Sequence, residues 1–426
     1  MTAAHALLIK GGRVIDPRMN RDGLFDVLIE RGKIADIQPS IPANGGAAID
    51  AQGQFVVPGF VDLHTHLRQP GREDKETIET GCHAAASGGF TSICAMPNTE
   101  PAIDGRGMVD LVHLEARRVG LVNVRVIGAI TRGRAGRELT EFGELFDAGC
   151  IALSDDGHPL VDSLLMRRAL EYAKLFGRPI IQHAEDPSLA AGGVMHEGLV
   201  SVTLGLRGSP AQAESVMVAR DVALAELTGG WLHVAHVSSG RSVEIIRQAK
   251  RRGVHVTCEA TPHHLALTDE AVGSFDAVAK VNPPLRSEQD RLALIEGLRD
   301  GTIDCIATDH APHTDWEKTA DFDSAPFGIT GLETALGVCI AVLVEPGHLS
   351  WPQLVDKLAA APASIVGTGG GSLAVGSDAD VTLIDPERSW TVDPSRFASK
   401  SRQSPFAGRT FRGAVTHTIV GGRVLG

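Results

Sequence analysis

The sequence is poor in three features that mark common classes of protein: aromatic residues, concentrated positive charge and long hydrophobic runs. Phe, Trp and Tyr make up only 4% of the 426 residues, which argues against a surface that stacks nucleic-acid bases. Asp and Glu number 52 against 40 Lys and Arg, so the net charge is −12, and no basic run interrupts it. We therefore expect neither nucleic acid nor an anionic membrane surface as a partner.

The hydrophobic runs and the cysteines indicate a cytoplasmic protein. Runs such as 337–344 fall far short of the ~20 apolar residues of a membrane-spanning helix. The N-terminus lacks the basic leader and the long apolar stretch of a secretory signal. The six cysteines are dispersed without a Cys-x-x-Cys pair, so we expect reduced thiols rather than disulfides or a structural zinc site.

The two ends of the chain resemble each other and differ from the middle. The segment IKGGRVI at 9–15 is nearly repeated as IVGGRVL at 419–425. Each copy predicts a strand, a Gly-Gly turn and a second strand. Because neither end alone offers enough sheet to bury a core, we expect residues 1–57 and 366–426 to form one small β-sandwich domain together.

The middle of the chain, 58–365, alternates buried-looking strands with amphipathic helical stretches such as 161–176, 210–228 and 241–252. This alternation predicts an α/β fold, a (β/α)₈ TIM barrel. An open doubly wound sheet is the alternative, but no glycine-rich phosphate loop follows the first strand. The expected strands are 58–66, 91–95, 124–130, 150–154, 179–183, 231–237, 254–259 and 303–308.

The most informative local feature is the segment PGFVDLHTHLR at 58–68. Alternate residues of a strand share one face, so His64 and His66 present two imidazoles side by side. That spacing suits two ligands of one metal ion. Taken alone, the pair is equally well explained by two histidines on a half-buried strand.

Further predicted strands end in residue types that bind metals: His183, His236, Asp309 and the adjacent Asp155 and Asp156. The carboxyl ends of barrel strands converge on one rim, where such side chains would meet. Four histidines and two aspartates exceed the three protein ligands of a mononuclear catalytic zinc site, so we expect two ions sharing a carboxylate. His233 has the opposite strand parity to His236 and is expected to face the helices.

With these residues in view, the chain resembles the amidohydrolase superfamily and, within it, the class I dihydroorotases of bacteria. The resemblance extends over essentially the full length. It includes, besides residues 58–68, the segments KETIETG at 75–81, MPNTEP at 96–101, SDDG at 154–157, QHAED at 182–186, HVSS at 236–239, EATPHHL at 259–265, VNPPLR at 281–286, ATDHAPH at 307–313 and APFGITGLETAL at 325–336.

The resemblance implies a zinc-dependent enzyme that reversibly cyclises N-carbamoyl-L-aspartate to L-dihydroorotate, the third step of pyrimidine synthesis. It implies two Zn²⁺ ions per subunit, one on His64 and His66 and the other on His183 and His236. The family pattern places the bridging carboxylate on Asp156 and makes Asp309 both a metal ligand and the catalytic acid and base. The substrate contacts that it implies are His66, Arg68, Asn98, Asn282, His313, Phe327 and Gly328.

Two other functions stay open on the sequence. One is a cyclic amidase of the hydantoinase or dihydropyrimidinase type, but those relatives are expected to bridge their metals with a carbamylated lysine, and residues 150–156 contain none. The other is a metal-free scaffold for aspartate carbamoyltransferase, which we would expect to have lost metal ligands. A homodimer and a complex with aspartate carbamoyltransferase are left open, and the loop at 312–328 is expected to cover the site as a lid.

Overall fold

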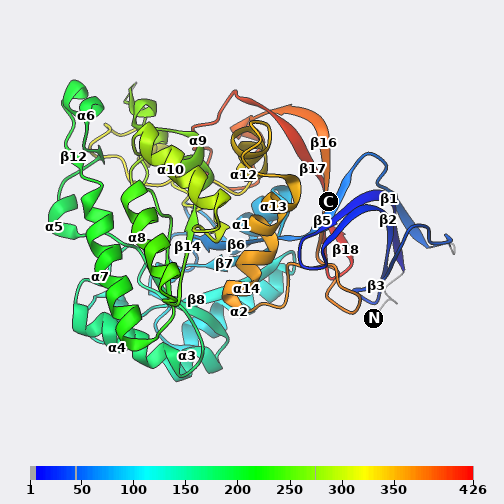
Figure 1. Ribbon diagram of the computed structural model, residues 1–426, viewed down its shortest axis with the longest axis horizontal. Coiled ribbons are helices and arrows are strands. Elements are labelled where there is room, and N and C mark those ends of the chain that lie inside the picture. The colour runs from blue at the N-terminus through cyan, green and yellow to red at the C-terminus, as the bar shows by residue number, and fades with distance from the viewer. Residues whose placement is uncertain (1–5, 44–45, 274, 426) are drawn as a thin grey trace.

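The computed structural model describes residues 6–43, 46–273 and 275–425. Its larger part is a parallel sheet of eight strands in the order β15-β14-β13-β10-β9-β8-β7-β6, curved into a barrel (Figure 1). The predicted (β/α)₈ architecture is therefore confirmed. The strands are β6 (Phe60–Thr65), β7 (Phe90–Ala95), β8 (Asn123–Gly128), β9 (Cys150–Ser154), β10 (Ile180–Gln182), β13 (Leu232–Val234), β14 (Val256–Ala260) and β15 (Cys305–Ile306).

The barrel nearly closes between its first and last strands. Thr65 and His310 form a parallel bridge, and the His66 N–H donates to the His310 carbonyl over 2.8 Å. The buried Asp62 carboxylate reinforces this seam, since it accepts the N–H of Thr308 at 3.0 Å and the Thr308 hydroxyl at 2.5 Å. The two edges that carry His64 and Asp309 are thus held together directly.

Helices cover the outside of the barrel and begin where the sequence offers a capping side chain. Thr77, Ser239 and Ser287 each accept a backbone N–H at the first turn of a helix. The helices are α1 (Ile78–Ser87), α2 (Arg106–Val119), α3 (Phe142–Asp147), α4 (Ser163–Lys174), α5 (Pro187–Ala190), α6 (Leu199–Leu204), α7 (Gln212–Thr228), α8 (Gly240–Arg251), α9 (Pro262–Ala266), α10 (Glu288–Arg299), α11 (Asp315–Lys318), α12 (Ala335–Cys339), α13 (Trp351–Val355) and α14 (Ala361–Val366).

Eight further strands come from the two ends of the chain and form one mixed sheet beside the barrel, in blue and orange to red in Figure 1. Its order is β18-β17-β16-β5-β1-β2-β3, with β4 also paired to β1. A sheet built jointly by both ends is what the paired sequence segments predict. The strands are β1 (Leu7–Asp16), β2 (Arg21–Glu30), β3 (Lys33–Gln38), β4 (Ala47–Asp50), β5 (Phe55–Pro58), β16 (Val381–Thr391), β17 (Thr410–Val420) and β18 (Arg423–Leu425). A two-stranded ribbon of β11 (Met195–His196) and β12 (Gly208–Ser209) lies apart from both sheets.

The two Gly-Gly pairs differ, and the prediction of a turn at the first pair is wrong. Gly421 and Gly422 do form the turn between β17 and β18. Gly11 and Gly12 instead lie inside β1, where the register against β2 shifts. Gly11 has φ of +69°, and its N–H donates to Asp26 over 2.8 Å. The buried Asp26 thus stabilises a bulge at the first copy and leaves no need for a turn.

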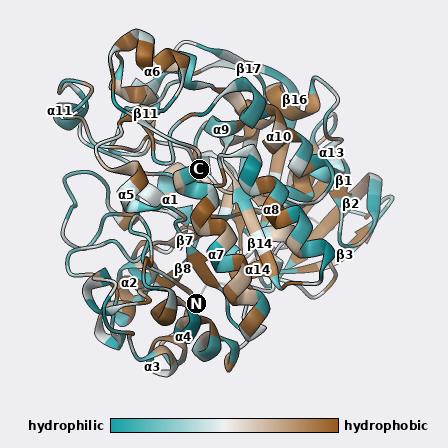
Figure 2. Cartoon of the chain, turned by 60° about the vertical axis from the view of Figure 1, so that its left-hand side comes forward, coloured by the Kyte–Doolittle hydropathy of each residue, from teal (hydrophilic) through white to brown (hydrophobic). Residues whose placement is uncertain are grey.

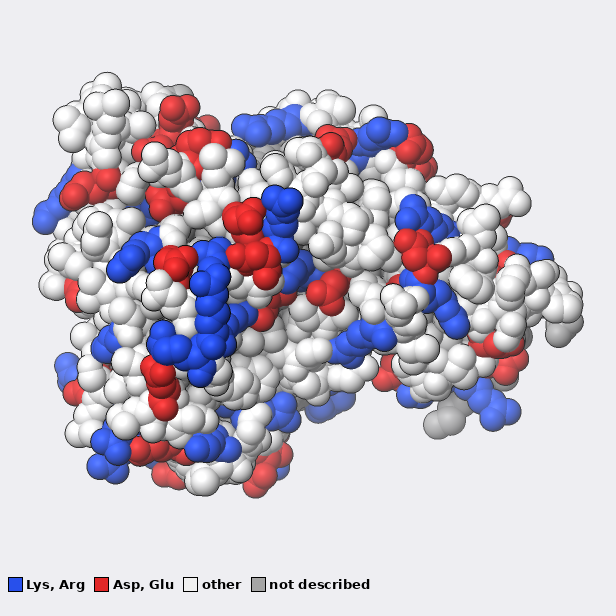
Figure 3. Space-filling view, in the orientation of Figure 1, with Lys and Arg blue, Asp and Glu red and all other residues white. Residues whose placement is uncertain are grey.

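The core lies between the barrel strands and their helices and is made of buried hydrophobic residues from both. In Figure 2, hydrophobic residues are brown on strands and on helices alike. All six cysteines are buried and free, as the sequence predicts. None of the described helices is long and apolar enough to cross a membrane. On the face seen in Figure 3, Lys and Arg lie among Asp and Glu.

Candidate active site

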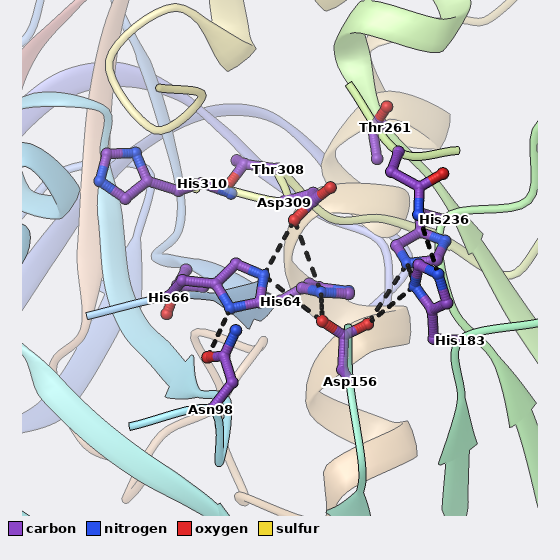
Figure 4. A network of polar contacts seen from close by, with 12 residues as sticks. His64, His66, Asn98, Asp156, His183, His236, Thr261, Thr308, Asp309 and His310 are labelled. Atoms are coloured by element: carbon purple, nitrogen blue, oxygen red, sulfur yellow. Dashed lines mark hydrogen bonds and ion pairs between the residues drawn. The ribbon is translucent and has the colours of Figure 1, made fainter. Parts of the chain in front are cut away.

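Six side chains gather at the carboxyl ends of the barrel strands: His64, His66, Asp156, His183, His236 and Asp309 (Figure 4). Each lies within a strand or within three residues of the end of one, so the barrel itself brings them together. All are buried, and the most exposed, Asp309, is only 7% exposed. We refer to these six residues as the strand-end cluster.

Asp156 lies at the centre of this cluster, between two pairs of histidines. Its Oδ2 is 3.4 Å from His64 Nε2 and 3.5 Å from His66 Nε2. Its Oδ1 is 3.5 Å from His183 Nδ1 and 3.3 Å from His236 Nε2. Each carboxylate oxygen therefore faces a different pair, which is the arrangement that a carboxylate shared by two ions needs.

The adjacent Asp155, which the sequence could not separate from Asp156, points elsewhere. Its Oδ1 accepts the N–H groups of Ile130 and Thr131 at 2.9 and 3.0 Å, and its Oδ2 accepts the Thr131 hydroxyl. These bonds anchor the loop after β8. Asp156 is thus the aspartate of the pair that faces the histidines.

Asp309, the sixth member of the cluster, lies beside His64 and His66. Its Oδ1 is 3.1 Å from His66 Nε2 and 3.6 Å from His64 Nε2. Burial raises the pKa of this carboxyl, but His64 and His66 outweigh burial and hold the pKa below its ordinary range. Asp309 is therefore a carboxylate at neutral pH and can accept a proton.

The donor atoms of the cluster fit a metal centre. Imidazole nitrogens and carboxylate oxygens are the usual ligands of zinc and related divalent ions. His64 Nε2 is fully buried and has no hydrogen-bond partner among the described residues. An orphaned nitrogen beside two buried carboxylates is costly unless a cation or a proton occupies the space between them.

Neighbouring side chains fix the orientation of the first two imidazoles. Glu259 Oε1 lies 2.7 Å from His64 Nδ1, and Asn98 Oδ1 lies 2.8 Å from His66 Nδ1. Both oxygens accept from Nδ1–H, which leaves the Nε2 lone pairs directed into the cluster, as metal ligation requires. The sequence reasoning missed Glu259, although this residue ends a predicted strand and begins the segment EATPHHL. It lies 195 residues from His64, so the sequence does not indicate their contact.

His233 contradicts the expectation that it faces the helices. It is fully buried inside the barrel, and its Nε2 lies 3.1 Å from the second oxygen of Glu259. The parity argument failed because β13 ends at Val234 and His236 has φ of +31°, so alternation does not continue from one histidine to the other.

Three residues of the site have a left-handed backbone: Arg68 (φ +60°), His236 (φ +31°) and Asp309 (φ +49°). Few residues other than glycine adopt this conformation, and where they do the surrounding structure must hold them there. At Asp309 the seam between Asp62 and Thr308 supplies that support.

A cavity of about 210 Å³ opens beside the cluster, large enough for a small polar ring compound. Besides cluster residues it is lined by the residues expected to contact substrate: Arg68, Asn98, Asn282, His313, Phe327 and Gly328. Gly328 has φ of +125°, and a Cβ there would lie 2.7 Å from the Ala311 carbonyl oxygen. Only glycine therefore fits at this position of the wall.

Arg68 and residues of the loop 312–328 form another part of the cavity wall. Arg68 Nε donates to the Pro312 carbonyl over 3.2 Å, and His313 Nε2 lies 2.8 Å from the Phe327 carbonyl oxygen. Burial lowers the pKa of Arg68 to about 10, which still leaves the guanidinium charged at neutral pH. The wall thus presents a cation and polar groups to whatever enters.

Larger cavities exist, including one of about 710 Å³ between the barrel and the sheet of the two chain ends. Its lining includes Arg388, Trp390 and Glu333 but none of the six cluster residues. The smaller cavity is the better candidate because strained backbone, buried histidines and perturbed carboxyls meet there.

The comparisons with known proteins point to one family. The family model described as dihydro-orotase-like matches residues 53–242. The chain is 54% identical to a dihydroorotase of Anaeromyxobacter sp. (strain K) over 422 residues, 98% of this chain and 97% of that protein. It is also 54% identical to a dihydroorotase of Pelotomaculum thermopropionicum over 419 residues, 98% of each.

Among solved structures, the fold is similar to an L-hydantoinase (dihydropyrimidinase) from Arthrobacter aurescens, with a TM-score of 0.87 and 29% identity over 98% of this chain and 95% of that one. A dihydropyrimidinase from Brevibacillus agri NCHU1002 gives a TM-score of 0.86 and 26% identity over 98% and 94%. Sequence and structure thus point to related cyclic-amide hydrolases.

Proposed function

Because the chain belongs to the dihydroorotase family of cyclic-amide hydrolases, we infer that its strand-end cluster is the metal centre of that activity. The reaction is the reversible cyclisation of N-carbamoyl-L-aspartate to L-dihydroorotate in pyrimidine synthesis. We assign His64 and His66 to one Zn²⁺ ion and His183 and His236 to a second. Asp156 would be shared by the two, and Asp309 would be a further ligand.

The position of Asp156 carries this proposal. Its two oxygens face two different histidine pairs, and residues 150–156 contain no lysine that could be carbamylated to take its place. That absence separates the chain from the hydantoinase type, to which its fold is similar. The presence of all six cluster residues also argues against a metal-free scaffold.

A bound divalent ion would supply Lewis acidity, which polarises a carbonyl group and makes water a usable nucleophile near neutral pH. The chain's own residues handle the proton and the substrate. Asp309, held as a carboxylate, takes the proton of the attacking water and delivers it to the ring nitrogen that leaves. In the cyclising direction the same carboxyl works in reverse.

The substrate's carboxylate requires local positive charge, because the protein as a whole carries −12. We propose that Arg68 grips this carboxylate through parallel N–H bonds and that Asn98, Asn282, His313 and the Phe327-Gly328 backbone complete the contacts. Support comes from their common position on the wall of one cavity.

We also propose that the loop 312–328 closes over bound substrate. It carries His313 and Phe327 into the cavity wall and is anchored by Lys318, whose Nζ donates to the carbonyls of Ala277 and Pro326 over 2.9 and 2.8 Å. Excluding water in this way strengthens polar contacts to the substrate.

A hydantoinase-like activity is the second candidate, favoured by the structural similarity. One experiment separates the two: metal analysis of the purified protein, with hydrolysis of dihydroorotate and of hydantoin measured on the same preparation. We expect two zinc ions per chain and turnover of dihydroorotate far above that of hydantoin. Preferred turnover of hydantoin, or full activity without metal, would refute the proposal.

Four further proposals concern the domains, location and partners of the enzyme. We divide the chain into a catalytic barrel of residues 58–365 and a composite domain of 1–57 and 366–426, supported by the separate sheet. A cytoplasmic location is supported by the free, buried cysteines. A homodimer and a complex with aspartate carbamoyltransferase are tested by sedimentation of the protein with and without that enzyme.

A further inference from the structure

His313 is the one imidazole on the loop side of the cavity, and both of its ring nitrogens have close polar neighbours. Nδ1 lies 3.1 Å from the Nζ of Lys75, and Nε2 lies 2.8 Å from the Phe327 carbonyl oxygen. Lys75 and His313 are both buried, at 7% and 6% exposure. Lys75 precedes α1 on a different segment of the chain and is not needed by any step described above.

These two neighbours together define which nitrogen of His313 carries the proton. An ammonium group has only protons to give, so Nδ1 must accept from Lys75. A carbonyl oxygen can only accept, so Nε2 must donate to Phe327. Both contacts require the same neutral form, with the proton on Nε2.

Glu317 is the group that could oppose this assignment, because its Oε2 lies 3.4 Å from His313 Nδ1. That is longer than the contact of Lys75, and Oε2 already accepts the N–H and the hydroxyl of Thr314, both at 3.1 Å. Its other oxygen, Oε1, lies 2.8 Å from Lys75 Nζ. Glu317 therefore orients Lys75 more than it competes for His313.

The direction of the Nε2 proton matters because Arg68 Nη2 lies only 3.5 Å from this nitrogen. A guanidinium has no acceptor, so with Nε2 protonated this is a meeting of two donors, not a hydrogen bond between them. Because the Nε2 proton is already donated to the Phe327 carbonyl, the neutral ring leaves the Arg68 guanidinium free to bind an anionic oxygen in the cavity. A further proton on Nδ1 would turn the ring into a cation whose Nε2 lies 3.5 Å from Arg68 and would repel the guanidinium.

We propose that Lys75 is a positioning residue: it donates to Nδ1 and so keeps His313 neutral, with its one proton on Nε2 bonded to the Phe327 carbonyl. The uncharged ring then leaves Arg68 in place to bind the substrate's carboxylate. This inference rests on the proposed function for the identity of the anion. The state of His313 itself does not depend on that function.

The test is ¹⁵N NMR of the holoenzyme labelled at histidine, with the His313 signals identified by their loss in His313→Asn. The chemical shifts distinguish a protonated from an unprotonated ring nitrogen. We expect the unmodified protein to show Nε2 protonated and Nδ1 bare. A proton on Nδ1, or on both nitrogens, would overturn the proposal without recourse to any variant.

The variant Lys75→Met removes this donor, and we expect Nδ1 to gain a proton, which Glu317 can accept, while Nε2 keeps its bond to the Phe327 carbonyl. The KM for dihydroorotate should rise about 10- to 100-fold while kcat changes less than about threefold, because the charged ring would displace Arg68 from a charge-assisted hydrogen bond to the substrate. Arg72→Met is the matched control: Arg72 also pairs with Glu317, at 3.3 Å, but does not contact His313. Its KM should stay within about twofold.

A Lys75→Met protein whose His313 Nδ1 stays bare would remove Lys75 from the role. If that variant does not fold, Glu317→Gln replaces it: Lys75 remains, so Nδ1 should stay bare, and a proton on Nδ1 would assign the role to Glu317 instead. Should the unmodified holoenzyme fail to turn over dihydroorotate, the proposed function fails, while the nitrogen shifts still decide the state of His313.

Discussion

The two sides of the cavity are built in different ways. The strand-end cluster is fixed by barrel strands, and its members lie within three residues of a strand or in one. The loop wall, by which we mean Arg68, His313, Phe327 and Gly328, belongs to connecting segments held by side-chain and carbonyl contacts. A rigid half suits chemistry that needs fixed distances, and a half on loops suits recognition of one particular substrate.

This comparison gives a general expectation for variants. Changes in the strand-end cluster should lower kcat for every cyclic amide that enters the cavity, because the bond-breaking groups are lost. Changes in the loop wall should raise KM, and only for substrates that carry the carboxylate. A strand-end variant that raises only KM, or a loop-wall variant that lowers kcat for every cyclic amide, would contradict this division.

The largest effect is expected for Asp309→Asn. An amide cannot take up the proton, so kcat should fall about 10³-fold or more for dihydroorotate and for uncharged dihydropyrimidine rings alike. Circular dichroism and thermal unfolding should show an unchanged fold. The control is Asp304→Asn, which removes the charge of a half-buried partner of Lys250 beside the same strand, away from the cluster, and should retain activity. Substantial turnover by Asp309→Asn would exclude the acid–base role.

The next largest effect, on the loop wall, is expected for Arg68→Met. Loss of two charge-assisted bonds should lower kcat/KM for dihydroorotate about 10²-fold or more, and that for an uncharged dihydropyrimidine ring less than about threefold. Steady-state kinetics on both substrates measure the ratio. Arg68→Lys should be a poor substitute, since an ammonium cannot form the paired bonds. Equal losses on both substrates would refute carboxylate recognition.

An intermediate effect, inside the barrel, is expected for Glu259→Gln. An amide can present N–H to His64 Nδ1, which would favour the wrong form of the imidazole. Metal affinity should fall about 10- to 100-fold, measured by competition with a chelator. Glu185→Gln should have a smaller effect, because Glu185 lies 3.9 Å from His183 Nε2. Unchanged affinity in Glu259→Gln would show that His64 needs no such support.

The smallest effect, at the base of the loop, is expected for Lys318→Met. The carbonyls of Ala277 and Pro326 would lose a buried donor, and the loop should loosen. We expect about a three- to tenfold rise in KM for dihydroorotate, little change in kcat and faster cleavage of 312–328 by protease. A fall in kcat with KM unchanged would instead tie the loop to the chemistry.

The division between strand ends and loops also explains which residues of the site could be predicted from the sequence. Strand ends converge in any barrel of this kind, so His64, His66, His183, His236 and Asp309 could be placed at one rim before the structure was known. The family resemblance favoured Asp156 over Asp155, but only the contacts of Asp155 with Thr131 and Ile130 show why the two neighbours diverge.

The position of His233 and the contacts of Glu259 and Lys75 could not be predicted from the sequence. They depend on irregular backbone and on contacts between distant segments. The left-handed backbone of His236 breaks the alternation that misplaced His233. Glu259 meets His64 across 195 residues, and Lys75 meets His313 across 238. No local pattern signals either pair, because each depends on how separate segments pack.

The sheet shared by the two chain ends has a consequence for synthesis. β5 pairs with β16 through Val56 and Leu383, so one edge of an early strand waits for a partner that is synthesised after the whole barrel. Until then, that edge is open to pairing with another nascent chain. We expect the barrel to form first and β16 to β18 to complete the sheet afterwards, which makes the addition of these strands the folding step most exposed to aggregation in a cell.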